Sequence, residues 1–160
     1  MTVYHGSDVV VEHPVIVNRN RFLDFGFGFY TTTNREQAVA FAHKVSQRRK
    51  TRTAIVNVYN VDEQLAFSEC STLRFDGADD KWLDFVVQNR NGIYIGQHYD
   101  LIFGAVANDD VYRTLTLYTA GVLSKQQTLE ALKVCKLYNQ LVFTTDRALC
   151  YLQFIRKELV

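Results

Sequence analysis

Asp24-Phe25-Gly26-Phe27-Gly28-Phe29-Tyr30-Thr31-Thr32 is the stretch that decides how the chain folds. Its two glycines lie among aromatic residues, so the backbone there can approach a flat ligand with no Cβ atom in between. The residues after Gly28 are aromatic or β-branched, the types that fit a pleated sheet, and they predict a strand. The alternative interpretation of the same residues is an aromatic core strand with a bulge.

Residues 2–5 form another strand-like segment, which ends at Gly6-Ser7. His5 on this segment and Tyr30 on a neighbouring strand would give one hydrogen-bonding ring and one stacking ring. Such a pair suits a ligand that has a sugar and a flat heterocycle. On an apolar strand, a histidine or a tyrosine can equally be a structural residue.

The composition is that of a globular protein with its own core. The chain has 160 residues, 48% hydrophobic and 22% charged, so a single domain over residues 1–160 is expected. The formal net charge of +1 demands neither a nucleic acid nor an anionic membrane as a partner. No apolar run approaches the roughly 20 residues that span a bilayer, and no signal region precedes the first strand. We therefore expect a cytoplasmic protein with no membrane partner.

The three cysteines, Cys70, Cys135 and Cys150, are odd in number and lack metal-ligand spacing, so we expect reduced thiols. Cys135 and Cys150 lie in apolar helical patterns, which predicts that both are buried. The four histidines also lack metal-binding spacing, and no metal site is expected.

Strands and helices are mixed along the chain without regular βαβ alternation, which favours an α+β domain with a mainly antiparallel sheet. A helix is predicted after Asn34 as N-cap, with Ala38, Phe41, Ala42 and Val45 as its apolar stripe. Residues 62–79 carry no clear pattern. The remaining predicted strands cover residues 54–61, 100–106, 139–144 and 153–160, and the remaining helices residues 80–91, 111–119, 124–136 and 145–152.

Three motifs follow one another along the chain: Tyr4-His5-Gly6-Ser7, the Asp24–Thr32 stretch with its following helix, and Asn139-Gln140-x-Val142-Phe143. Together they resemble a bacterial ADP-ribosyltransferase-like family that is catalogued as a domain of unknown function. The resemblance runs over almost the whole chain. It implies a split antiparallel β core with flanking helices and NAD as substrate. It also implies NAD-dependent mono-ADP-ribosyltransferase activity on a macromolecular acceptor, protein or nucleic acid, by an intracellular bacterial toxin of a toxin–antitoxin pair with a small antitoxin protein.

The same resemblance implies roles for residues of the first two motifs. His5 would hydrogen-bond an NAD ribose, and the backbone of Gly6 would bind the nicotinamide carboxamide. Tyr30 would stack on the nicotinamide ring, and Thr31 and Thr32 would offer hydroxyl groups in that pocket.

Gln140 occupies the third position, where the wider superfamily usually has a glutamate. Cleavage of the nicotinamide–ribose bond builds positive charge on the ribose, which a glutamate stabilises and a glutamine does not. The loss of one such electrostatic contributor costs on the order of 10²- to 10³-fold in rate. Asp24, Asp109 and Asp110 are the candidates for a substitute carboxylate, although the last two also fit a turn and N-cap. A weak or inactive NAD- or ADP-ribose-binding module and an NAD glycohydrolase remain the alternatives.

Two groups of basic residues are candidates for contacts with phosphates. Arg19 and Arg21 would either meet the NAD pyrophosphate, which suits arginine geometry, or lie in a solvated loop. Arg48-Arg49-Lys50-x-Arg52 either touches a nucleic-acid acceptor or forms a solvated helix end that suits the helix dipole.

Overall fold

The fold is built on one seven-stranded sheet with the strand order β4-β5-β6-β2-β1-β3-β7. The computed structural model describes residues 1–17, 23–105, 109–135 and 137–160. In this part of the chain the strands are β1 (Thr2–Ser7), β2 (Phe29–Thr32), β3 (Ile55–Val61), β4 (Thr72–Arg74), β5 (Leu101–Ala105), β6 (Asn139–Phe143) and β7 (Leu152–Leu159). The helices there are α1 (Arg35–Arg49), α2 (Glu63–Glu69), α3 (Asp80–Arg90), α4 (Asp109–Thr119), α5 (Lys125–Lys133) and α6 (Asp146–Leu149).

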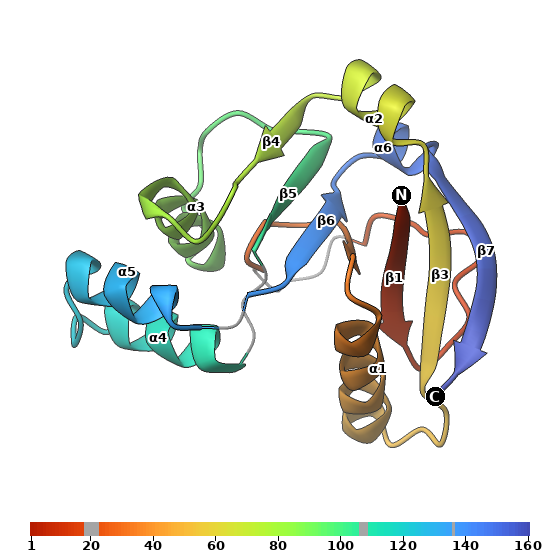
Figure 1. Ribbon diagram of the computed structural model, residues 1–160, viewed down its shortest axis with the longest axis horizontal. Helices are drawn as coiled ribbons and strands as arrows, with labels where there is room; N and C mark the ends of the chain where they lie inside the picture. The colour runs from red at the N-terminus through yellow and green to blue at the C-terminus, as the bar shows by residue number, and fades with distance from the viewer. Residues whose placement is uncertain (18–22, 106–108, 136) are drawn as a thin grey trace.

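Most strand pairs are antiparallel, as the sequence predicts for an α+β domain. The exception among the described pairs is β4 with β5, which run parallel. Figure 1 shows β4, β5 and β6 in one half of the molecule and β1, β3 and β7 in the other. In the strand order, β2 lies between β6 and β1 and joins the two halves.

The join between the two halves is narrow. β1 pairs with β3 over six register positions, and β2 pairs with β6 over four. Between the fully described strands β1 and β2, by contrast, the register joins Tyr4 with Thr32 and no further pair. The sheet is therefore continuous in strand order but weakly paired at its centre.

Side chains alternate between the two faces of the sheet along each strand. Both faces carry apolar residues, and helices cover both of them. On one face, α3, α4 and α5 pack with the β5 and β6 residues Ile102 and Val142, and α1 packs on β1 and β3. On the opposite face, α2 and α6 pack around Val3, Phe29 and Leu141. These two faces are called here the α3–α5 face and the α2–α6 face.

Several helix ends follow their predicted local signals. The Asn34 side chain accepts a hydrogen bond from the Gln37 backbone N–H at 2.9 Å and caps α1. Ser124 and Gln127 form the predicted capping box of α5. Gly92 and Gly121 follow α3 and α4 with positive φ angles of 67° and 74°, a conformation that glycine adopts without strain.

The segment without a clear pattern, residues 62–79, contains α2 and β4. Both elements are short, and α2 fully buries one of its residues, Ala66. Neither element therefore produces the long hydrophobic periodicity on which prediction depends. In retrospect, Asp62 was the available signal, because its side chain caps α2 by accepting from the Leu65 N–H.

The predicted burial of three side chains is wrong. Phe41 was assigned to the buried stripe of α1, but 50% of it is exposed and the buried residues are Ala38, Ala42, Val45 and Ser46. Cys150 is exposed and Cys135 half-buried, whereas Cys70 is buried; all three are free thiols. Cys135 and Cys150 lie just after the last residues of α5 and α6. None of the described helices has both the length and the apolar character needed to cross a membrane.

Candidate functional site

Three neighbouring strands carry the three residues that the sequence singles out most strongly. His5 lies on β1, Tyr30 on β2 and Gln140 on β6, and these strands are adjacent in the order β6-β2-β1. Gln140 pairs in register with Thr32 of β2. The fold thus places residues from distant parts of the sequence on neighbouring strands.

His5 bridges the weakly paired centre of the sheet. Its Nδ1 atom lies 2.8 Å from the carbonyl oxygen of Tyr30, and its ring centroid lies 4.5 Å from that of Phe29. A carbonyl only accepts hydrogen bonds, so Nδ1 carries the proton and donates. Burial lowers the pKa of His5, although the hydrogen bond to Tyr30 opposes this effect. The neutral ring then presents Nε2 as a hydrogen-bond acceptor.

His5 and the other two residues lie on different faces of the sheet. His5 stacks against Phe29, which belongs to the core on the α2–α6 face. Tyr30 packs against the core on the α3–α5 face, and the neighbour of Gln140 on that face of β6 is Val142. A ligand in contact with all three would have to lie at the centre of the sheet, where β1 and β2 part.

The hydroxyl of Tyr30 holds the glycine-containing loop in place. It accepts a hydrogen bond from the Phe25 N–H at 3.1 Å and donates one to the Gly26 carbonyl at 2.6 Å. Burial raises the pKa of Tyr30, the bond from Phe25 lowers it, and the nearby charge of Asp24 raises it further. The hydroxyl therefore stays protonated and works as a structural brace, while the ring remains the part available for stacking.

Gly6 is required by packing. A Cβ atom at this position would lie 2.2 Å from the Ala38 carbonyl oxygen and 2.8 Å from the Ala42 nitrogen, both in the backbone of α1. The close approach of α1 to β1 thus explains this glycine without a ligand. A contact between its backbone and a carboxamide would be an additional role.

Gln140 is buried, with 3% of its surface exposed. Its Nε2 atom lies 3.4 Å from the carbonyl oxygen of Ala105, which also accepts a hydrogen bond from Trp82 Nε1 at 3.1 Å. The side chain amide is thus anchored to β5 through its nitrogen. A carboxylate at this position would have no proton to donate to that carbonyl.

The hydroxyls of Thr31 and Thr32 already have backbone partners. Thr31 Oγ1 donates to the Leu141 carbonyl at 2.7 Å, within the buried part of the sheet. Thr32 Oγ1 lies 2.6 Å from Gln37 Oε1 and accepts from the Asn34 N–H at 3.1 Å. Both hydroxyls thus already take part in hydrogen bonds within the protein. To bind a ligand, either hydroxyl would have to accept an additional hydrogen bond from it.

The candidate carboxylates lie in different settings. Asp24 forms an ion pair with Arg90 at 3.1 Å, and the Arg90 guanidinium lies 4.4 Å from the ring centroid of Tyr112. Asp110 is exposed in the first turn of α4. Asp109 begins α4, and its side chain lies outside the described part of the chain. Asp24 thus connects the glycine-containing loop to α3 and α4.

The family model described as "Protein of unknown function (DUF3990)" matches residues 1–154. The chain belongs to the DUF3990 family. None of the curated proteins matches the chain, and neither does any of the solved structures.

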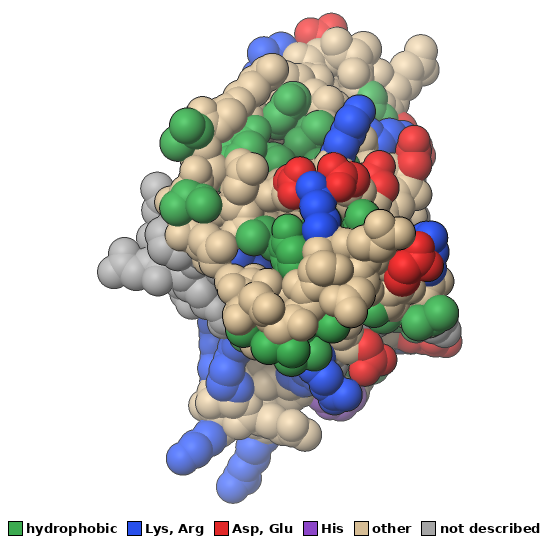
Figure 2. All heavy atoms as spheres, turned by 90° about the vertical axis from the view of Figure 1, so that its left-hand side faces the viewer, with side chains coloured by type: hydrophobic (Ala, Val, Ile, Leu, Met, Phe, Trp, Pro, Cys, Tyr) green, Lys and Arg blue, Asp and Glu red, His purple; other side chains and the backbone are tan. Residues whose placement is uncertain are grey.

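The structure describes one of the two basic groups of this DUF3990 chain that the sequence singles out. Arg19 and Arg21 lie outside the described residues. In the run after α1, Arg49 forms a 2.7 Å ion pair with Asp8, whose side chain is 4% exposed. Figure 2 shows basic side chains gathered at the lower end of the molecule, where α1 ends in Figure 1. Arg49 therefore has a structural role as the ion-pair partner of Asp8.

Asn57 is a neighbour of His5 that the sequence analysis of this DUF3990 chain did not single out. It is fully buried on β3, directly opposite His5 in register. Its Oδ1 accepts from the Val11 N–H at 2.8 Å, and its Nδ2 donates to the Val9 carbonyl at 3.1 Å. The available signal was a lone asparagine in the otherwise apolar start of a strand, Ile55-Val56-Asn57-Val58.

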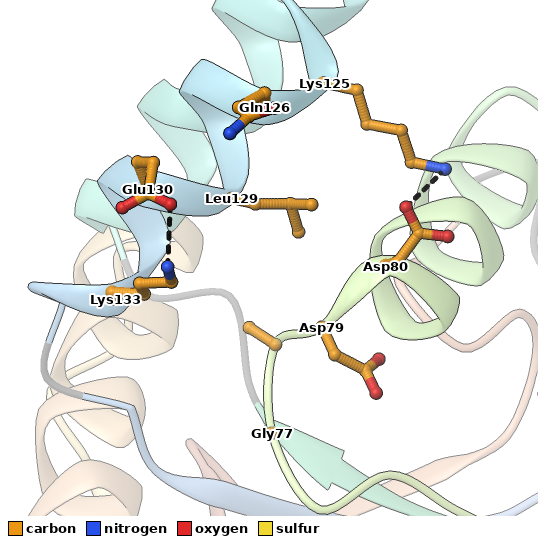
Figure 3. A pocket seen from close by; sticks show the side chains of 9 residues that line it. Gly77, Asp79, Asp80, Lys125, Gln126, Leu129, Glu130 and Lys133 are labelled. Atoms are coloured by element: carbon orange, nitrogen blue, oxygen red, sulfur yellow. Dashed lines mark hydrogen bonds and ion pairs between the residues drawn. The ribbon is translucent and has the colours of Figure 1, made fainter.

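Two hollows lie on the α3–α5 side of the DUF3990 fold. The larger, about 720 Å³, lies between α5 and the start of α3, where Lys125 pairs with Asp80 at 2.8 Å (Figure 3). The smaller, about 350 Å³, is lined by the aromatic loop residues Phe25 and Phe27 and by parts of α3. Among the described residues, the linings of both hollows lack His5, Gly6, Tyr30 and Gln140.

Proposed function

We propose that this DUF3990 chain is an NAD-dependent mono-ADP-ribosyltransferase that binds NAD where β1 and β2 part. The observation that carries the proposal is the adjacency of β6, β2 and β1, which bear Gln140, Tyr30 and His5. The single register pair between β1 and β2 supports it, because the two strands part beyond that pair. The motif resemblance supplies NAD as the substrate.

In this proposal the neutral His5 binds a ribose hydroxyl. Its Nδ1 proton is held by the Tyr30 carbonyl, so Nε2 accepts a hydrogen bond from the hydroxyl. Tyr30 offers its ring for stacking on nicotinamide while its hydroxyl braces the loop. Both rings are fixed by hydrogen bonds before the ligand arrives, which reduces the ordering that binding requires.

The reaction is the exchange of one bond at the ribose. The bond between the ribose carbon and nicotinamide breaks, and nicotinamide leaves with the bonding electron pair. The acceptor's lone pair then forms the new bond to that carbon, and the acceptor's proton is released. Gln140 would hydrogen-bond a ribose hydroxyl through Oε1, since its Nε2 donates to Ala105. It adds no negative charge, so turnover below that of a glutamate enzyme is expected.

The acceptor in this proposal is a macromolecule, either protein or nucleic acid, and the biological role is that of an intracellular bacterial toxin restrained by a small antitoxin protein. The motif resemblance alone supports these two statements. The near-neutral net charge of +1 favours neither acceptor class.

A second candidate function is binding of NAD or ADP-ribose without turnover. The setting of Gln140 favours it, because a buried amide bonded to a backbone carbonyl is well suited to hold a ligand but supplies no charge. The variant Gln140→Glu distinguishes the two: a gain of turnover would mean that the native site is limited by missing charge.

The test uses NAD labelled in its adenylate part, mixed with the purified chain and a bacterial lysate, while nicotinamide release is followed separately. Transfer of label to a macromolecule that is lost in His5→Ala and kept in His43→Ala supports the transferase. His43 is an exposed histidine on α1 and serves as the matched control. Nicotinamide release without labelled product would identify a glycohydrolase. Binding without release would identify the binding module.

A further inference from the structure

We propose that the side of α1 that carries Phe41 and Arg48, together with Lys50 and Arg52 after the helix, docks a single-stranded nucleic acid. The strand would be the acceptor of the proposed transferase. The inference rests on the proposed function only in calling the strand an acceptor, because the docking itself needs no NAD. Figure 2 shows basic side chains gathered at the lower end of the molecule, where α1 ends in Figure 1.

The end of α1 and the loop after it carry concentrated positive charge. Arg48, Lys50 and Arg52 are all exposed. The sequence has no aspartate or glutamate between Glu36 and Asp62. The partial negative charge at a helix C-terminus amounts to roughly half an elementary charge, so it offsets only a small part of these full positive charges. The excess of positive charge favours an anionic partner such as a phosphate backbone.

The backbone that carries these basic residues is held by hydrogen bonds and an ion pair. Arg49 pairs with Asp8 at 2.7 Å, which ties the end of α1 to the chain that follows β1. Ser46 Oγ donates to the Thr51 carbonyl at 2.8 Å, and the Thr51 N–H donates to the Ser46 carbonyl at 3.0 Å. The loop is thus folded back onto the helix before a ligand arrives, which reduces the ordering that binding requires.

An exposed aromatic ring lies on the same side of α1 as Arg48. Phe41 is 50% exposed, and it precedes Arg48 by about two helical turns, so the two side chains share one side of the helix. The side that packs on the sheet carries the buried residues Ala38, Ala42, Val45 and Ser46. The Phe41 ring can stack on an unpaired base while the arginine binds a phosphate. The bases of a duplex are already stacked on one another, so this pair of side chains suits a single strand.

The same side of α1 leads to the proposed NAD site. Gln37 lies about one turn before Phe41, and its Oε1 lies 2.6 Å from Thr32 Oγ1. Thr32 in turn pairs in register with Gln140. Gln37 and Arg48 are separated by about 16 Å along the helix axis, roughly the length of five stacked nucleotides. A strand longer than this span reaches from the basic end of α1 to the site.

The packing of α1 favours a nucleic acid over an anionic membrane. A helix that inserts into a membrane surface needs an apolar face that is open to the lipid. The buried face of α1 is instead used by the protein, where Ala38 packs with Val56 and Val58 of β3. Arg48 and Arg52 have planar guanidinium groups, which bind phosphate oxygens in pairs. An acidic peptide lacks the flat bases on which the exposed ring stacks.

The test is a fluorescence-anisotropy titration of the full chain, without NAD, into a labelled oligodeoxyadenylate longer than this span, at several salt concentrations. The oligonucleotide should bind. The double variant Arg48→Gln, Arg52→Gln should weaken binding by about tenfold and lower the slope of log affinity against log salt by about 1.4, since each phosphate contact contributes about 0.7. The matched control Lys81→Gln, Lys133→Gln removes two exposed charges from α3 and α5 and should change neither value.

The role of the aromatic ring has its own variant. Phe41→Ala should weaken oligonucleotide binding by about fivefold or more, because it removes the stacking surface. Leu65→Ala is the control, since Leu65 is an apolar residue of similar exposure, 51%, on α2. Unchanged affinity in Phe41→Ala, or an equal loss in Leu65→Ala, would overturn the docking geometry.

Other results would also overturn the proposal. These are absent binding, unchanged affinity in the arginine double variant, an equal loss in the lysine double variant, and tighter binding of a duplex of the same length. Tighter binding of phosphatidylserine vesicles would make the partner a membrane, and tighter binding of polyglutamate would make it an acidic protein. An oligoriboadenylate of the same length distinguishes RNA from DNA, and preference for either one supports the docking surface.

Addition of labelled NAD separates this inference from the proposed function. A strand that binds but gains no label, while nicotinamide is still released, would keep the docking surface and remove the strand as acceptor. If nicotinamide release is absent as well, the proposed transferase is wrong and the docking surface stands. Label transfer to the strand that is unchanged in the arginine double variant would support the transferase and overturn the docking surface.

Discussion

His5 Nδ1 lies 2.8 Å from the Tyr30 carbonyl oxygen, across the point where β1 and β2 stop pairing. One hydrogen bond therefore joins the two halves of the sheet at the place where the proposed NAD site lies. It also fixes the tautomer of His5 and leaves Nε2 as an acceptor.

The lowered pKa of His5 predicts a pH dependence of stability. Burial lowers the pKa of His5 below its ordinary value of about 6.5, so below that pH the unfolded chain binds more protons than the folded one. The free energy of unfolding should therefore fall as the pH drops from about 7 to about 5. In urea titrations, His5→Ala should reduce this slope and His43→Ala should keep it. Equal slopes in the wild type and His5→Ala would contradict the account.

The contact between α1 and β1 predicts the effect of a methyl group at position 6. In Gly6→Ala the new carbon would lie 2.2 Å from the Ala38 carbonyl oxygen, so α1 must move. Such overpacking costs about 1–3 kcal/mol of unfolding free energy, measurable by urea denaturation. Gly77→Ala is the matched control, because a Cβ there meets nothing within 4 Å. A change of similar size in both variants would remove the packing explanation.

The brace formed by the Tyr30 hydroxyl predicts separate effects of Tyr30→Phe on stability and on binding. The variant leaves the Phe25 N–H and the Gly26 carbonyl without this partner, which should cost about 1–3 kcal/mol of unfolding free energy. Because the ring remains, NAD affinity should fall less than in Tyr30→Leu. Thermal unfolding and NAD titration of both variants provide the measurement. Unchanged stability in Tyr30→Phe would show that the hydroxyl does not brace the loop.

The ion pair between Asp24 and Arg90 predicts that the two residues act as a unit. Their side chains are 15% and 21% exposed, so a double-mutant cycle with Asp24→Asn and Arg90→Gln should give a coupling energy of about 1 kcal/mol. The pair of Glu130 and Lys133, 58% and 68% exposed, should couple more weakly. If Asp24 positions the loop, both single variants should lower nicotinamide release alike. A loss confined to Asp24→Asn would make Asp24 the substitute carboxylate.

Long elements with strong local signals were predictable from the sequence. The cap at Asn34, the capping box at Ser124 and the glycines after α3 and α4 mark helix ends by local chemistry alone. The central strands were predictable because they are apolar or alternate. α2 and β4 were missed, since short half-exposed elements depend on tertiary contacts for their stability.

The sequence names the residues of the candidate site, but it does not predict how they are arranged. The sequence indicated His5, Tyr30 and Gln140, but it gave no sign that His5 lies on the opposite face of the sheet from the other two. Strand order and register decide the face, and both depend on long-range pairing. The same reason hid Arg90, whose partner Asp24 lies on a different element.

The most direct test of the central claim is a titration of the isotopically labelled chain with NAD, followed by NMR at each backbone amide. The account predicts saturable shifts at Gly6, Thr31 and Gln140, lost in His5→Ala and kept in His43→Ala. Absent binding, or shifts that avoid β1, β2 and β6, would contradict it.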